Sequence, residues 1–147
     1  MLEALERLCG GTARPGDVEL LEELAAGVRE GSLCALGRTA PNPVLSTLRH
    51  FRAEYEAHLT GRCPAGRCKA LIAYTIGDEC IGCTRCAQHC PAKAIEARPY
   101  EKHRIDPSRC IRCGTCRQTC PSNAVHVVPK AEAAAPEAGA LLETLHA

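Results

Sequence analysis

The chain contains a cysteine-rich segment that occurs twice. Residues 78–91 read DECIGCTRCAQHCP, and residues 108–121 read SRCIRCGTCRQTCP. Every cysteine of the first run recurs thirty positions later in the second, and so does the proline that follows the fourth cysteine. A repeat this regular indicates that one structural unit is present twice in the fold.

The spacing within each run indicates which metal group the repeat can hold. Three cysteines are separated by two residues each, and a fourth cysteine follows after three more residues and precedes a proline. This C-x2-C-x2-C-x3-C-P pattern is typical of bacterial ferredoxins with two 4Fe–4S clusters, in which the fourth cysteine of each run ligates the other cluster. A zinc ribbon instead uses two C-x2-C pairs per ion, about 12 to 20 residues apart. Zinc and disulfides are the alternatives to iron and sulfide.

The pattern therefore predicts two crossed sets of ligands. The first set is Cys80, Cys83, Cys86 and Cys120, and the second set is Cys110, Cys113, Cys116 and Cys90. Neither half of the repeat can complete its own cluster, so iron–sulfur bonds join the halves. We expect the fourth cysteine of each run to begin a helix, because the proline after it has the φ angle and the missing N–H of a first helical turn.

Short β-branched stretches flank both cysteine runs. We predict strands at 70–76 and 103–108, before the runs, and at 93–97 and 123–127, after them. Strands on either side of each cysteine loop match a (βαβ)2 ferredoxin-like domain over residues 70–129.

The beginning of the chain has helical periodicity instead. Residues 2–8, 17–31 and 42–59 carry apolar side chains three and four positions apart, with Asp17 and Asn42 as candidate N-caps. The predicted fold class is α+β, in four parts. These are a helical bundle over 1–60, a cysteine-containing hinge over 61–69, the ferredoxin-like domain over 70–129 and a flexible tail over 130–147.

Composition limits the remaining possibilities. The 147 residues include 12 cysteines but one phenylalanine, three tyrosines and no tryptophan, and small domains poor in apolar mass need metal or disulfides to fold. No secretory signal and no apolar run of about 20 residues is visible, so we expect a cytoplasmic chain without membrane insertion. In such a reducing compartment clustered cysteines bind metal. The lack of aromatic side chains that stack on bases argues against nucleic acid as a partner.

The junction between the predicted bundle and the ferredoxin-like domain carries a further metal-binding pattern. His58, Cys63 and Cys68 form H-x4-C-x4-C, and two thiols with an imidazole suit Zn²⁺, which takes four nitrogen or sulfur ligands. The fourth ligand would come from another segment or another chain. The alternative is a pair of free thiols, with His58 at the end of a helix, where its charge is favoured by the helix dipole.

Much of the chain resembles a known family. The stretches MLEALERLCGG, DVELLEELA and SLCALGRTAPNPVLSTLRHFRAEYEAHL resemble the C-terminal part of the NADH-binding flavoprotein subunit of complex I. With the two-cluster extension, roughly residues 1–129 are similar to the homologous subunit of NAD(P)-linked FeFe hydrogenases and formate dehydrogenases. The resemblance implies electron transfer within a multisubunit NAD(P)H-linked oxidoreductase, with a flavoprotein and other subunits as partners.

The resemblance also implies a role for Cys34. In that family the cysteine of the SLCxLG segment is the fourth ligand of a further 4Fe–4S cluster, whose other three ligands come from an S-C-G-x-C-x-P-C-R segment. That segment is not in this sequence, so Cys34 is either a ligand completed from elsewhere or a buried free thiol. Cys9 has no counterpart in the motif and is expected to be a core or surface thiol.

Two other functions stay open at this point. The glycine-rich flavin and nucleotide motifs are not in this sequence, so we expect no FMN or NAD site and no catalysis by this chain alone. A free-standing two-cluster ferredoxin with a helical appendage is one alternative, and it would be monomeric. A zinc-stapled interaction module is the other, and it would be colourless.

Overall fold

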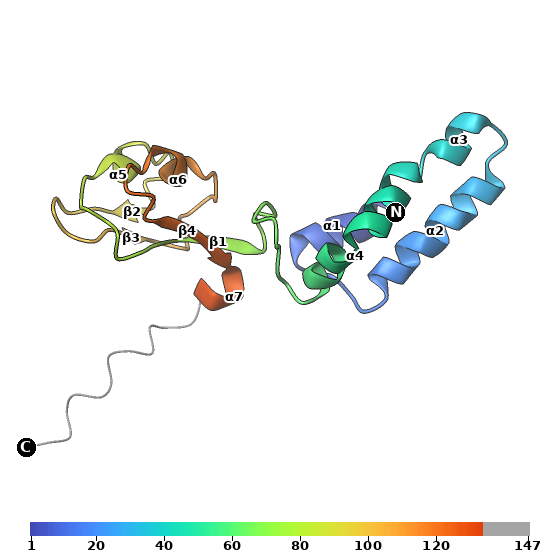
Figure 1. Cartoon of the computed structure of the whole chain (residues 1–147), viewed down its shortest axis with the longest axis horizontal. Coiled ribbons are helices and arrows are strands. Elements are labelled where there is room, and N and C mark those ends of the chain that lie inside the picture. Colours follow the sequence, from blue (N-terminus) through green and yellow to red (C-terminus); the bar gives the residue numbers. More distant parts are fainter. Residues whose placement is uncertain (134–147) are drawn as a thin grey trace, which may run out of the picture. The chain divides into compact units, whose positions relative to one another are not determined.

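The chain is divided into two compact units of different construction. The computed structural model describes residues 1–133, and its two units are Met1–Leu71 and the unit that begins at Ile72. The first is helical, whereas the second consists of short helices and two small antiparallel sheets (Figure 1). The fold class is therefore α+β, as predicted.

Four helices form the first unit. They are α1 (Leu2–Gly10), α2 (Asp17–Gly31), α3 (Ala35–Thr39) and α4 (Asn42–Leu59). The bounds of α2 and α4 are the predicted ones, and α1 is two residues longer than predicted. The five-residue helix α3 was not predicted, because five residues are too few to establish a helical period.

The caps of these helices differ from the prediction. Asp17 lies inside α2, and the N-cap is Gly16, whose φ of 90° is in the left-handed region that glycine adopts without strain. Asn42 is likewise the first residue of α4 and not its cap. The Asp17 carboxylate instead accepts hydrogen bonds from the backbone N–H of Arg14 at 2.8 Å and from Nε of Arg7 at 3.1 Å.

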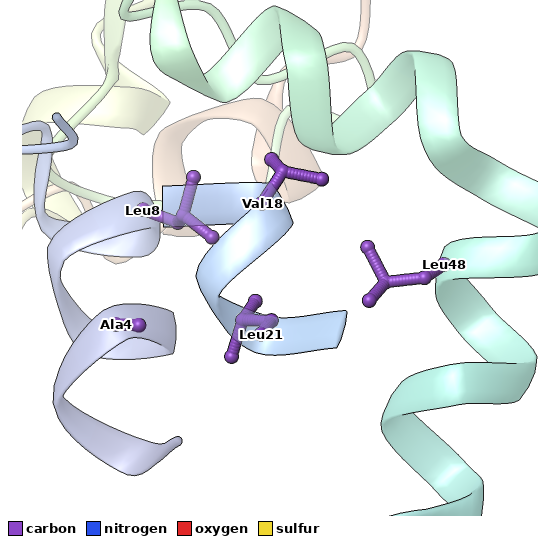
Figure 2. Close-up of a cluster of buried hydrophobic side chains, with 5 residues drawn as sticks. All are labelled: Ala4, Leu8, Val18, Leu21 and Leu48. Atoms are coloured by element: carbon purple, nitrogen blue, oxygen red, sulfur yellow. The ribbon is translucent and has the colours of Figure 1, made fainter. Parts of the chain in front are cut away.

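A small apolar core holds α1, α2 and α4 together. Figure 2 shows Ala4 and Leu8 of α1, Val18 and Leu21 of α2, and Leu48 of α4 directed toward one another. Each buried leucine contributes about 1.5–3 kcal/mol relative to an exposed one. The predicted apolar stripe of α4 is interrupted, because the backbone leaves helical geometry at Phe51 (φ −130°, ψ 32°) and its side chain is 55% exposed.

Two strand pairs organise the second unit. Strand β1 (Ile72–Ile76) pairs with β4 (Val125–Pro129), and β2 (Ile95–Glu96) pairs with β3 (Arg104–Ile105), both antiparallel. The strands before and after each cysteine run are where the β-branched stretches indicated. The first and last of them are the longest, and β2 and β3 have two residues each.

The helices of the second unit precede the fourth cysteine of each run, whereas a helix was predicted to begin at that cysteine. Helices α5 (Arg85–Gln88) and α6 (Thr115–Thr119) contain the third cysteine of each run, and the fourth cysteine follows the helix. After the prolines the chain turns toward β2 and β4. Lys93 and Asn123 have φ angles of 48° and 54° there, which an α-helix does not allow.

The backbone of the repeat is duplicated together with its sequence. Positive φ angles occur at Gly82 (66°) and Thr84 (59°) in the first run, and at Arg112 (56°) and Gly114 (82°) in the second. These positions are related by the same displacement of thirty, as are Lys93 and Asn123. The two cysteine runs thus follow the same local path although glycine occupies different positions in them.

The described chain ends in one helical turn, α7 (Lys130–Ala133). The rest of the predicted tail, residues 134–147, lies outside the described residues. Across residues 1–133 no helix has the length and apolar character needed to cross a membrane.

Candidate metal centres

Two cavities of the second unit are lined by cysteines. The first is lined by Cys80, Cys83, Cys86 and Cys120. The second is lined by Cys90, Cys110, Cys113 and Cys116. The structure thus brings together, around each cavity, three cysteines of one run and the fourth cysteine of the other.

Several other lining residues repeat the same relation. Ile81 in the first cavity corresponds to Ile111 in the second, and Ala124 corresponds to Ala94, each pair being thirty positions apart. The two cavities are therefore equivalent in construction. The exchange of the fourth cysteine follows from the short turn after each helix, which carries the chain away from its own loop.

The thiols in these cavities have perturbed acidities. Burial raises the pKa of Cys86 and raises that of Cys116 to about 11, and the negative charges of the other thiolates in each set add to the effect. Deprotonation of these thiols therefore needs a compensating positive charge, which a bound metal supplies. Four cysteine thiolates around one cavity are the donor set of a 4Fe–4S cluster.

The fourth cysteines receive hydrogen bonds from the backbone. The N–H of Ala94 lies 3.3 Å from Sγ of Cys90. Burial alone would raise the pKa of Cys120, but the hydroxyl of Ser122 and the N–H groups of Ala124 and other residues of that turn lower it. These donors favour the thiolate, which is the form that binds iron.

A third group of donors lies in the first unit. The ligand atoms of His58, Cys63 and Cys68 lie within 4.8 Å of one another, and Nε2 of His58 is 3.3 Å from Sγ of Cys68. Although burial opposes it, hydrogen bonds from the N–H groups of Cys68 and Arg67 lower the pKa of Cys63. Burial and the neighbouring Cys63 raise the pKa of Cys68. The structure therefore brings together all three residues of the predicted zinc pattern.

Cys9 joins this group, which the sequence did not indicate. It lies in α1, is exposed, and its thiol interacts with that of Cys68, where it also raises the pKa. A third sulfur, and with it a fourth possible donor, therefore lies near the predicted group. Cys9 is 49 residues before His58 in the sequence, and only the packing of α1 against α4 brings the two together.

Cys34 lies apart from these groups. It is the N-cap of α3 and is exposed, so the expectation of a buried thiol is wrong. Its neighbours Leu33 and Leu36 are 101% and 82% exposed. Within residues 1–133 it belongs to no group of three or more potential metal ligands.

Comparisons with known families agree with the two units. Residues 1–58 match the family described as the NADH-ubiquinone oxidoreductase-F iron-sulfur binding region. Residues 79–124 match the 4Fe-4S dicluster domain. These matches confirm the resemblance that the sequence indicated, and the second covers all eight cysteines of the two cavities.

Two individual relatives are named as subunits of a hydrogenase and of NADH-ubiquinone oxidoreductase. The NADP-reducing hydrogenase subunit HndC of Solidesulfovibrio fructosivorans is 39% identical over 105 residues, which is 70% of this chain and 21% of that protein. The mitochondrial NADH-ubiquinone oxidoreductase 51 kDa subunit of Aspergillus niger is 34% identical over 58 residues, which is 40% of this chain and 12% of that protein. The chain thus spans about a fifth or less of the length of these relatives.

Proposed function

We propose that this chain, in which an NADH-ubiquinone oxidoreductase-F iron–sulfur binding region is followed by a 4Fe–4S dicluster domain, transfers electrons through two 4Fe–4S clusters within a multisubunit NAD(P)H-linked oxidoreductase. The observation that carries the proposal is the pair of equivalent cavities, each lined by four cysteines. A bound 4Fe–4S cluster accepts and releases one electron at a time. No group for hydride or bond chemistry is needed for that role.

The side chains around each cavity have defined tasks in this function. The cysteines hold the clusters, and the crossed fourth ligands fix the two halves of the repeat to each other. Ile81 and Ile111 place hydrocarbon beside the cysteine loops, where it limits access of water. The N–H groups that contact Cys90 and Cys120 offset negative charge on the thiolates when an electron arrives.

We infer that the second unit has the (βαβ)2 arrangement of two-cluster ferredoxins. The duplicated φ angles and the pairing of the first strand with the last support it, because both relate the two halves of the unit by one operation. The names of the relatives, which are subunits of larger enzymes, support a flavoprotein and other subunits as partners. Twelve cysteines without a disulfide among the described residues suit the reducing cytoplasm.

Iron content and crossed ligation test the proposal. Anaerobically reconstituted protein should be brown and bind about eight iron and eight sulfide per chain. Cys120→Ser should disturb the cluster held by Cys80, Cys83 and Cys86, and Cys90→Ser should disturb the other. Damage confined to the cluster of the mutated run would contradict the crossed sets, and a colourless protein would favour the interaction module.

A second proposal concerns the donors of the first unit. We propose that Cys9, His58, Cys63 and Cys68 hold one Zn²⁺, since three sulfurs and one nitrogen form a common structural zinc set. The short distances among the last three, and the contact of Cys9 with Cys68, support it. Metal analysis should find about one zinc per chain. Cys63→Ser should lose zinc and keep iron, whereas Cys34→Ser should keep both; zinc retained in Cys63→Ser contradicts the site.

A further inference from the structure

Among the described residues, the lining of the first cluster cavity includes a buried histidine, and that of the second does not. His103 lines the first cavity and is 3% exposed, and its Nδ1 lies 3.3 Å from Sγ of Cys86. Its other ring nitrogen, Nε2, is buried and has no hydrogen-bond partner among the described residues. The imidazole is therefore removed from water, and its polar contact within residues 1–133 is the one with Cys86.

The chemistry of the ligand decides the direction of this hydrogen bond. A cysteine bound to iron is a thiolate and has no proton to donate. Nδ1 must therefore carry the hydrogen and donate it to Sγ of Cys86, which fixes the tautomer of His103. Because both groups are buried, the N–H dipole acts through a medium of low dielectric constant and has more effect than the same contact in water.

We propose that His103 is a positioning residue for the first cluster, and that its hydrogen bond to Cys86 holds this cluster at a higher reduction potential than it would otherwise have. Reduction adds negative charge to the cluster and its thiolates, and the positive end of an N–H dipole stabilises that charge. Hydrogen bonds to the sulfurs are one of the factors that set such potentials. The inference rests on the proposed function, because it needs a cluster in the first cavity.

Over residues 1–133, the lining of the second cavity contains a tyrosine and no histidine. Tyr74, on β1, lines that cavity. Its hydroxyl lies close to Gly114, 2.9 Å from the position that a Cβ at Gly114 would take. Sγ of Cys113 does have a hydroxyl partner, Thr115 at 3.3 Å, but this contact is exposed. The buried imidazole therefore distinguishes the first cluster from the second.

Substitution of His103 in the full-length chain tests the inference. His103→Leu keeps much of the volume and removes the donor, whereas His103→Asn places an amide nitrogen at a position comparable with Nδ1. Redox titration followed by electron paramagnetic resonance resolves the two clusters, and the signal missing from Cys120→Ser identifies the first one. We expect His103→Leu to move that one potential to more negative values and His103→Asn to restore it in part.

Tyr74→Phe is the matched control, since it changes a lining residue of the other cavity and should leave the potential of the first cluster unchanged. An unchanged potential in His103→Leu, with about eight iron still bound, overturns the inference while the proposed function stands. Absence of both signals from the unsubstituted protein would instead refute the function.

If His103→Leu fails to retain its clusters, a second measurement decides. In unsubstituted protein labelled with ¹⁵N-histidine, pulsed electron paramagnetic resonance should detect a nitrogen coupling in the signal of the first cluster. That coupling should be lost in His103→Asn. Its absence from the unsubstituted protein overturns the inference.

Discussion

The two units of the chain have interiors of different chemistry. The core of the first unit is hydrocarbon, built from Ala4, Leu8, Val18, Leu21 and Leu48. In the second unit the buried cluster consists of two thiols and one valine, namely Cys86, Cys116 and Val125. Two of its three members are therefore cysteines that we propose as cluster ligands, and we expect the bound clusters to complete the interior of the second unit.

The two units also differ in how much backbone hydrogen bonding their helices and strands provide. The helices of the first unit satisfy their own backbone groups and run for up to 18 residues. The second unit has two pairs of strands with two to five residues each, and an isolated two-stranded sheet is marginally stable in water. We therefore expect the first unit to fold by burial of side chains and the second by ligation of metal.

Removal of iron from the full-length protein should reveal this contrast most strongly. Without clusters, the crossed sulfur bonds between the halves are lost and the buried thiols have no metal partners. Amide hydrogen exchange should then become fast in β1 and β4, while α2 stays protected. Mass spectrometry of the full chain before and after anaerobic chelation measures both.

The same experiment contains its control. A chelator also takes zinc, so protection is compared in α2, away from the hinge, and a sample with zinc restored separates the two metals. Retention of slow exchange in β1 and β4 after iron is gone would show that the second unit folds without its clusters. That result would remove the contrast between the units.

Truncation of a core leucine should affect only the first unit. Leu21 is fully buried, and Leu21→Ala should lower the free energy of unfolding by about 2–5 kcal/mol, because it removes buried methyl groups and leaves a cavity. Urea unfolding followed by the helical circular dichroism signal measures the loss. Leu24→Ala, at a position 37% exposed, should cost much less. A change in cluster absorbance in Leu21→Ala would contradict the prediction that the interiors of the two units are stabilised independently.

Glycine substitutions should destabilise the two cysteine loops to different extents. The effect should be smaller than that of truncating a core leucine. A Cβ at Gly82, where φ is 66°, would lie 2.5 Å from backbone atoms of Tyr100, and the backbone would have to move. A Cβ at Gly114 would meet the Tyr74 hydroxyl at 2.9 Å, which a side-chain rotation relieves. The left-handed conformation alone costs about 1–2 kcal/mol for alanine. Gly82→Ala should therefore lose iron to a chelator faster than Gly114→Ala, and equal rates would show that the contact with Tyr100 does not distinguish the loops.

Substitution of a glycine in the first unit should instead increase the free energy of unfolding. Gly27 lies within α2, and among residues 1–133 no atom beyond its chain neighbours and the helix's own backbone lies within 4 Å of its Cβ position. Gly27→Ala should therefore stabilise the helix by about 0.8–1.0 kcal/mol, because alanine loses less backbone entropy in a helix than glycine does. Urea unfolding followed by circular dichroism measures the gain. A destabilised Gly27→Ala would mean that this face of α2 is covered.

The sequence predicted what ligand chemistry and periodicity dictate. Spacing along the run determined which cysteines share a cavity, because three ligands of each cluster come from one short loop. Periodicity gave the bounds of α2 and α4. It did not reveal that α5 and α6 precede Cys90 and Cys120, because a proline suits a turn as well as a first helical turn.

Contacts between distant segments could not be predicted in this way. Cys9 contacts Cys68 only because α1 packs against α4, and no spacing rule relates the two residues. The sequence indicates that His103 is the start of a strand. Its contact with Cys86 depends on the residue just before β3 lying beside the first cavity. Cys34 was expected to be a ligand on family grounds or otherwise a buried free thiol, and it is exposed.

Acid should reveal a further difference between the units, through one ion pair. Asp17 is 3% exposed, and its hydrogen bonds with the Arg7 side chain and the Arg14 N–H lower its pKa from 3.8 to about 2. A carboxyl with a depressed folded pKa stabilises the fold above its unfolded pKa, and this contribution is lost as pH falls through the folded value. The helical unit should therefore lose stability between about pH 5 and pH 2.

Asp17→Asn tests this dependence against a matched substitution. In Asp17→Asn the free energy of unfolding of the helical unit, measured by urea at successive pH values, should be lower at pH 6 and should fall less from there to pH 2. Glu30→Gln changes an exposed carboxylate of the same helix and should keep the dependence of the unsubstituted chain. Acid also protonates the thiolates of the second unit, so cluster absorbance is lost in all three proteins alike. An identical acid profile in Asp17→Asn and the unsubstituted chain would show that the pair with Arg7 contributes nothing, and that the first unit depends on its hydrocarbon core alone.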